Sequence, residues 1–176
     1  MRKLFYLFSL ATLLALTGVS KGYAQYRSDR IMVGLGALID KSLDATISYE
    51  HETKYHNAWE YFATASLQWD DCATCGHICD DSFWNNYNTI RGGVAYKPSV
   101  FRGRNNYGNV RVGGSLGYDS DKDLVAGLHL GYEHSYALKS GWQLYWQVRC
   151  DGTFWARDFF KGGATIGFKI PTGNKR

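Results

Sequence analysis

The stretch that decides the fold is the twelve-residue segment AWEYFATASLQW, residues 58–69. Its side chains alternate between two faces with period two, which is the pattern of a β-strand that has one face in an apolar environment. Its length is also that of a tilted strand that crosses a membrane. One face carries Trp59, Tyr61, Ala63, Ala65, Leu67 and Trp69, and the other carries Glu60, Phe62, Thr64, Ser66 and Gln68.

Similar segments occur from residue 31 almost to the end of the chain, separated by clusters of turn-forming residues. The composition agrees with this pattern, because 6 Trp, 13 Tyr, 9 Phe and 20 Gly against 2 Pro favour strands and tight turns. We predict an all-β fold, an eight-stranded antiparallel up-and-down outer-membrane β-barrel. The other strands are expected within residues 31–40, 43–51, 90–96, 110–118, 124–133, 142–151 and 164–170.

The contents of the two faces decide between a membrane barrel and a soluble one. A lipocalin-like barrel has large apolar side chains inside, whereas a membrane barrel turns them toward lipid and has a polar lumen. Most strand glycines fall on the face that also carries long charged side chains, and this mixture can fill the narrow lumen of eight strands. The polar face is therefore predicted to be the lumen, with a network of Glu50, Glu60, Arg91, Arg111, His129, Glu133, Arg149 and Lys169.

Aromatic residues on the apolar face give a second test, because they should collect at the two membrane interfaces. If the strands run alternately up and down from a periplasmic N-terminus, most of them come near the lower end. These are Tyr49, Trp59, Tyr61, Tyr96, Tyr132 and Trp142, whereas Trp69 and Tyr118 come near the upper end.

The first 24 residues have the order of a secretory signal peptide: a charged start, an apolar run and a small-x-small end at Gly22-Tyr23-Ala24. We expect cleavage before Gln25 and a single barrel domain over residues 25–176. Three of the 20 basic residues lie in this leader, which leaves 17 against 16 acidic ones. A nearly neutral mature chain without a basic run gives no reason to expect nucleic-acid binding.

The one compact group of reactive residues is Cys72-x-x-Cys75-x-x-x-Cys79, with His77 inside it. In a cytosolic protein this spacing would suggest a zinc or iron–sulfur site. Outside the cytoplasm cysteines usually form disulfides, and the strand directions place Cys150 at the same end of the barrel. We therefore expect a bond from Cys150 into the loop and a second bond within it, with free thiols and a metal site as alternatives. No metal or other cofactor is expected.

No other group of residues indicates catalysis. Lumenal Glu, Arg and His could serve a hydrolase, but in a narrow barrel they more often form a neutralising salt-bridge network. No Gly-x-Ser-x-Gly motif is present. The protein is therefore not expected to be an enzyme; loss of an activity on mutation of His77 or His129 would indicate otherwise.

Several segments resemble the TraO-type conjugative-transposon proteins of Bacteroidetes. The likeness covers residues 87–170 and the leader, which ends in Tyr-Ala-Gln. Its motifs are YNTIRGGVAY at 87–96, VGGSLGYD at 112–119 and GGATIGFKI at 162–170. The cysteine loop at 70–86 and the short segment 119–123 depart from that pattern. The resemblance implies a non-enzymatic outer-membrane protein encoded with a DNA-transfer apparatus, and it brings no catalytic residues.

The expected function is that of a structural or accessory component of a conjugative or export apparatus, in the outer membrane of a Gram-negative bacterium. Its partners would be outer-membrane lipid and other components of the machine. The alternatives are a soluble periplasmic carrier of a hydrophobic ligand and a small barrel for adhesion or membrane stability.

Overall fold

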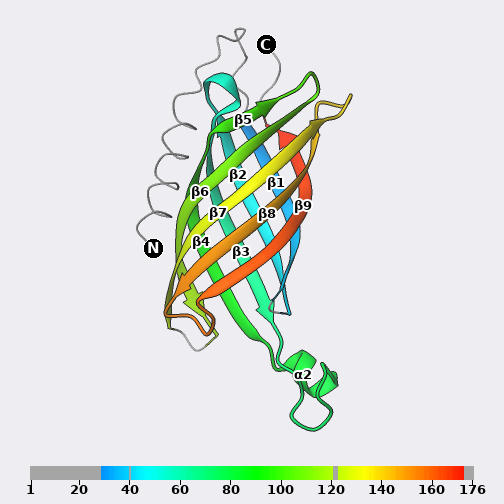
Figure 1. Cartoon of the computed structure of the whole chain (residues 1–176), viewed down its shortest axis with the longest axis vertical. Helices are drawn as coiled ribbons and strands as arrows, with labels where there is room; N and C mark the ends of the chain where they lie inside the picture. The colour runs from blue at the N-terminus through cyan, green and yellow to red at the C-terminus, as the bar shows by residue number, and fades with distance from the viewer. Residues whose placement is uncertain (1–28, 40, 121–122, 173–176) are drawn as a thin grey trace, which may run out of the picture.

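A computed structural model describes residues 29–39, 41–120 and 123–172, which form one antiparallel β-barrel (Figure 1). The predicted signal peptide, residues 1–24, lies outside the described residues. The elements are β1 (Asp29–Leu38), β2 (Ser42–Glu52), the 3-10 turn η1 (Lys54–His56), β3 (Ala58–Gln68), α2 (Asp80–Trp84), β4 (Tyr87–Lys97), β5 (Ser99–Arg102), β6 (Asn106–Asp119), β7 (Leu124–Ala137), β8 (Gln143–Phe154) and β9 (Phe160–Pro171).

Each strand pairs with its neighbours in the chain, and β1 pairs with β9 to close the sheet. Both β4 and β5 pair with β6. They are two parts of one long strand of the barrel wall, which is interrupted at Pro98. Proline has no N–H for the ladder, so it interrupts the strand there. With β4 and β5 counted as one strand, the barrel has the eight strands predicted from the sequence. None of the helices in the described ranges is long and apolar enough to cross a membrane.

The polarity of the barrel wall is that of a membrane protein. Apolar side chains in mid-strand point outward: Leu116 is 62% exposed and Leu128 61% exposed. Lys97, Glu133 and Lys169 are fully buried inside. A soluble carrier of a hydrophobic ligand needs the reverse arrangement, so this alternative disagrees with the structure.

Lumenal glycines leave the space that the larger side chains fill. A Cβ atom at Gly34 would overlap the hydroxyl group of Tyr145, and one at Gly93 would overlap the ring of Phe62. Both aromatic residues are buried in the lumen. The glycines on the polar face are therefore a packing requirement of a narrow, filled barrel.

The two ends of the barrel differ. The terminal end, where Arg30 pairs with Pro171, has short connections; the other, the α2 end, carries the longest one, residues 69–86 (Figure 1). Outer-face aromatic pairs gather toward the terminal end, as in Trp59–Tyr96 at 5.0 Å between ring centroids. The other residues expected there also lie on the outer face toward that end, namely Tyr49, Tyr61, Tyr132 and Trp142.

At the α2 end the prediction was right for Tyr118, which is exposed, and wrong for Trp69. The alternation stops at Gln68, and Trp69 is buried because the following loop folds back over it. Its ring stacks on Phe83 at 5.5 Å, and its Nε1 donates to the Phe83 carbonyl at 2.7 Å. The exposed aromatic residues at this end come instead from the β8–β9 connection: Trp155, Phe159 and Phe160.

The outward face can be tested with Leu128→Arg, which puts a charge on the wall midway between Leu124 and Tyr132. We expect the free energy of unfolding in lipid vesicles to fall by about 2–4 kcal/mol, the cost of arginine near a bilayer midplane. Leu138→Arg, in the turn at the terminal end, is the matched control and should cost about 0–1 kcal/mol. Equal effects of the two substitutions would contradict the membrane placement.

Candidate functional site: the charged lumen and the cysteine loop

The lumen is lined by charged side chains from all parts of the barrel. Among the described residues, seven basic and six acidic side chains are buried, together with His129. They include all eight residues that the sequence placed there. The sequence prediction omitted six others, namely Arg30, Asp44, Glu52, Lys97, Asp151 and Lys161.

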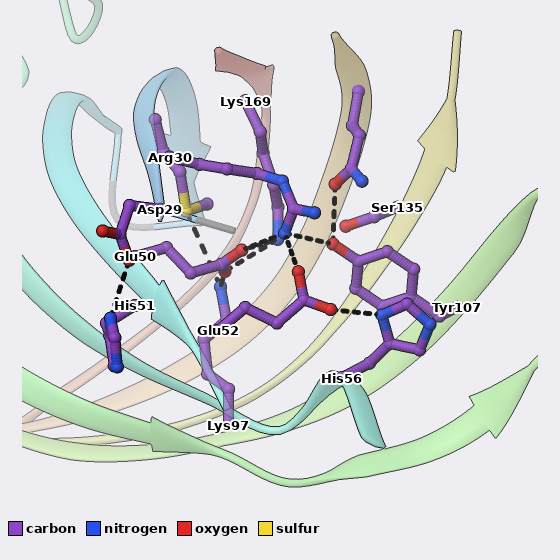
Figure 2. Close-up of polar contacts among 12 residues, drawn as sticks. Asp29, Arg30, Glu50, His51, Glu52, His56, Lys97, Tyr107, Ser135 and Lys169 are labelled. Carbon is purple, nitrogen blue, oxygen red and sulfur yellow. Dashed lines mark hydrogen bonds and ion pairs between the residues drawn. The ribbon is translucent and has the colours of Figure 1, made fainter. Parts of the chain in front are cut away.

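Two lysines occupy the centre of the terminal half of the lumen (Figure 2). Lys169 Nζ lies 2.8 Å from Glu50 Oε2 and 2.6 Å from Glu133 Oε1. Lys97 Nζ donates to the other oxygen of Glu133 at 2.8 Å and also bonds Glu50. Each carboxylate thus bridges both ammonium groups.

A second group covers this set toward the terminal end. Arg30 Nη1 lies 2.6 Å from Glu52 and 3.3 Å from Glu50. Tyr107 donates from its hydroxyl group to Gln143 at 2.6 Å and stacks on the ring of His56, with 4.5 Å between centroids. Figure 2 shows these side chains converging from opposite walls. They close the terminal mouth with paired polar groups.

Deeper in the barrel, Arg111 Nε donates to Glu60 at 2.7 Å and its guanidinium lies 4.3 Å from the ring centre of Phe62. Arg149 Nη2 pairs with Asp44 at 2.7 Å, and the Arg149 side chain also reaches Asp151 at 3.5 Å. Oppositely charged pairs therefore continue along the lumen from the lysine cluster toward the α2 end.

Ser115, His129 and Asp151 form a hydrogen-bonded chain in the lumen. Ser115 Oγ lies 2.7 Å from His129 Nε2, and His129 Nδ1 lies 2.8 Å from Asp151. The same order of contacts activates the serine of hydrolases, where the hydroxyl group must reach a substrate carbonyl. Here all three side chains are buried, and Phe62 packs edge-on against the imidazole at 5.2 Å. The chain fixes His129 within the charged network.

The cysteine loop forms a separate structured unit beyond the α2 end of the barrel (Figure 1). Its base is held by the Trp69–Phe83 stack and by ion pairs of Asp70 with Arg157 and Asp71 with Lys41. The Sγ atoms of its three cysteines all lie within 4.8 Å of one another. Backbone N–H groups of Thr74 and Cys75 bond the Cys72 sulfur and lower the pKa of its thiol to about 6.

Both predicted disulfides, the one from Cys150 into the loop and the one within the loop, are wrong for this structure, in which all four thiols are free. Cys150 does lie toward the α2 end, but Arg149 and Asp151 on either side point into the lumen, so Cys150 points outward from the wall. The loop cysteines project beyond the barrel mouth. The strand direction was predicted correctly, but the face of Cys150 makes the bond impossible without moving the wall.

Comparisons with known proteins identify the fold and no family. No family model matches the chain, and no curated protein matches it. The crystal structure of a major outer membrane protein from Thermus thermophilus aligns with 84% of this chain and 100% of its own, at 10% identity and a TM-score of 0.53. A designed transmembrane β-barrel aligns with 86% of this chain and 100% of its own (12% identity, TM-score 0.47). The designed barrel TMB2.3 aligns with 84% and 96% (13% identity, TM-score 0.48).

The fold, its inside-out polarity and the likeness to the Thermus protein agree: the chain is a transmembrane β-barrel of the outer-membrane type. At an identity of 10% the likeness concerns the fold alone.

Substitution of Lys169 by Met tests the lysine cluster. It leaves Glu50 and Glu133 with one lysine between them, and we expect the free energy of unfolding to fall by about 3–5 kcal/mol, the cost of breaking a buried ion pair. Lys139→Met, in an exposed turn, is the control and should change it by less than about 0.5 kcal/mol. Denaturant titration in lipid vesicles measures both. A Lys169→Met protein as stable as the wild type would mean that the cluster carries no net stability.

Proposed function

We propose that this chain is a non-conducting outer-membrane barrel that serves as a structural or accessory component of a conjugative or export apparatus in a Gram-negative bacterium. The observation that carries the proposal is the filled lumen. Paired charges and buried Phe62 and Tyr145 occupy it from the terminal mouth to the α2 end, so passage of solutes is a poor candidate for its role.

The placement of the connections supports a role in contacts at one end. In outer-membrane barrels the short turns are periplasmic and the longer loops extracellular. By that rule the α2 end faces the cell exterior and both ends of the described barrel chain face the periplasm. The projecting loop presents Phe83 and Trp84, 46% and 79% exposed, where a partner could meet them.

The assignment to a transfer apparatus rests on the resemblance of residues 87–170 to the TraO-type proteins. These residues include β4 and β6–β9, which line much of the lumen. The motifs contain the lumenal residues Arg91, Ser115 and Lys169 together with the glycines that make room for them. The resemblance thus extends to residues that fill the barrel.

Conductance tests the first half of the proposal. The protein refolded into a planar lipid bilayer should give no current steps above those of the lipid alone, because paired charges and buried aromatic side chains fill the lumen. A porin inserted under the same conditions is the positive control. Stable porin-sized steps would contradict a non-conducting barrel.

Transfer frequency tests the second half. Deletion of the gene in a donor cell should lower transfer of its element, and the wild-type gene should restore it. A Trp84→Ser protein should restore it about tenfold less well, since truncation of a large aromatic contact commonly costs more than about 1.4 kcal/mol. Trp155→Ser, exposed at the same end, is the matched control. Unchanged transfer in the deletion strain, with the barrel absent from its membranes, would overturn the assignment.

A further inference from the structure

The three loop cysteines have the spacing of metal ligands. Zinc–sulfur bonds of about 2.3 Å in a tetrahedron separate neighbouring sulfurs by about 3.8 Å. The Sγ atoms of Cys72, Cys75 and Cys79 lie within 4.8 Å of one another, so a metal would need to draw them together by about 1 Å or less. A disulfide would use two of the three and leave the third without a partner.

The backbone around the first two cysteines forms a tight closed turn. Gly76 donates its N–H to the Cys72 carbonyl at 2.8 Å, and Cys72 donates its own to the carbonyl of His77 at 3.0 Å. Gly76 has φ +71°, a conformation that glycine adopts without strain. These backbone hydrogen bonds hold Cys72 and Cys75 in one closed turn.

The third cysteine comes from a clamped element. Cys79 directly precedes α2, and its N–H donates to Ser82 Oγ at 2.9 Å. The same short helix supplies Phe83, which stacks on Trp69 at the barrel mouth. The position of Cys79 relative to Cys72 is therefore set by the packing of the loop on the barrel.

From this geometry we propose that Cys72, Cys75 and Cys79 bind one thiophilic cation, with Zn²⁺ as the first candidate. Three sulfur donors select soft or borderline ions such as Zn²⁺ over the oxygen-seeking Ca²⁺ and Mg²⁺. Each thiol that binds releases its proton, so a fully protonated site gives up three protons per metal. Asp80 and Asp81 add negative charge beside the site, which favours a cation there.

The fourth coordination position is open to water. His77 is the nearest alternative ligand in sequence, but its Nδ1 bonds the Cys75 carbonyl at 2.8 Å and its ring nitrogens lie outside the sulfur cluster. The metal would close the eight-residue segment 72–79 and so order the part of the loop that projects farthest from the barrel.

Cobalt titration tests the site directly. The full chain, refolded in detergent with its thiols reduced, should bind one equivalent of Co²⁺ with an intense thiolate-to-cobalt absorption band, and one equivalent of Zn²⁺ should remove that band. Cys79→Ser should weaken binding on the order of 100-fold or more through loss of one ligand. Cys150→Ser, which keeps the three loop cysteines, should bind as the wild type does.

Two further variants sharpen the proposal. His77→Ala should leave the Zn²⁺ affinity within about threefold of the wild type, and a loss as large as that of Cys79→Ser would replace the open position with a histidine ligand. Gly76→Ala should weaken binding about tenfold, because it strains the turn by about 1–2 kcal/mol.

Protease sensitivity supplies a readout that needs no metal spectrum. Chymotrypsin should cut after Phe83 or Trp84, and Zn²⁺ should slow this cleavage about tenfold in the wild type and not at all in Cys79→Ser. If correctly folded wild-type protein gives no thiolate-to-cobalt band when Co²⁺ is added, the metal site is wrong. A disulfide between two loop cysteines in alkylated protein taken directly from membranes would also overturn it.

Discussion

The interaction on which the rest of the structure depends is a set of four buried ion pairs, in which two carboxylates are each shared by two lysines. Lys97 and Lys169 come from β4 and β9, and Glu50 and Glu133 come from β2 and β7. The ion pairs therefore connect four different strands across the lumen. An ion buried alone would cost several kcal/mol. Because each of these four ions meets at least two of opposite sign, all four can be buried without any of them being left unpaired.

This constraint explains why one strand pattern serves two environments. Period-two alternation sends every second side chain to lipid and the others to the lumen, so a slip of one residue would place charges in the hydrocarbon. Glycines such as Gly34 and Gly93 give up volume to Tyr145 and Phe62, which lets long ion-pairing side chains and aromatic rings share a narrow barrel. A single strand register therefore satisfies both requirements: it fills the lumen with paired side chains and turns apolar side chains toward lipid.

The sequence was sufficient for the parts of the fold that depend on alternation. It predicted the eight strands, the lumenal face and the outward position of Tyr118, since each follows from the period-two alternation of side chains along a strand. It missed Lys97 because Pro98 ends the run there, although Lys97 continues the lumenal face of Arg91, Gly93 and Ala95. Arg30 was missed because the first strand was predicted to begin at Ile31, whereas β1 begins at Asp29.

The errors at the α2 end have a different cause. Burial of Trp69 depends on where the loop folds, and that is set by the contact with Phe83, fourteen residues further along the chain. The disulfide prediction used the compartment and the strand direction but not the face of Cys150, which its neighbours Arg149 and Asp151 determine. Such contacts between a loop and a wall have no period, so alternation carries no information about them.

The two ends of the molecule are consequently built on different principles. The barrel wall is held by its closed ladder and its internal ion pairs, and no contact of the loop cysteines is needed to complete either. The loop is held by a stack on Trp69 and by surface ion pairs, which contribute little individually. Because these contacts are weak, a bound metal would order the cysteine loop more than it could order the barrel wall, which its ladder already fixes. A metal bound to the projecting loop would therefore change the conformation of the loop without disturbing the membrane-embedded barrel.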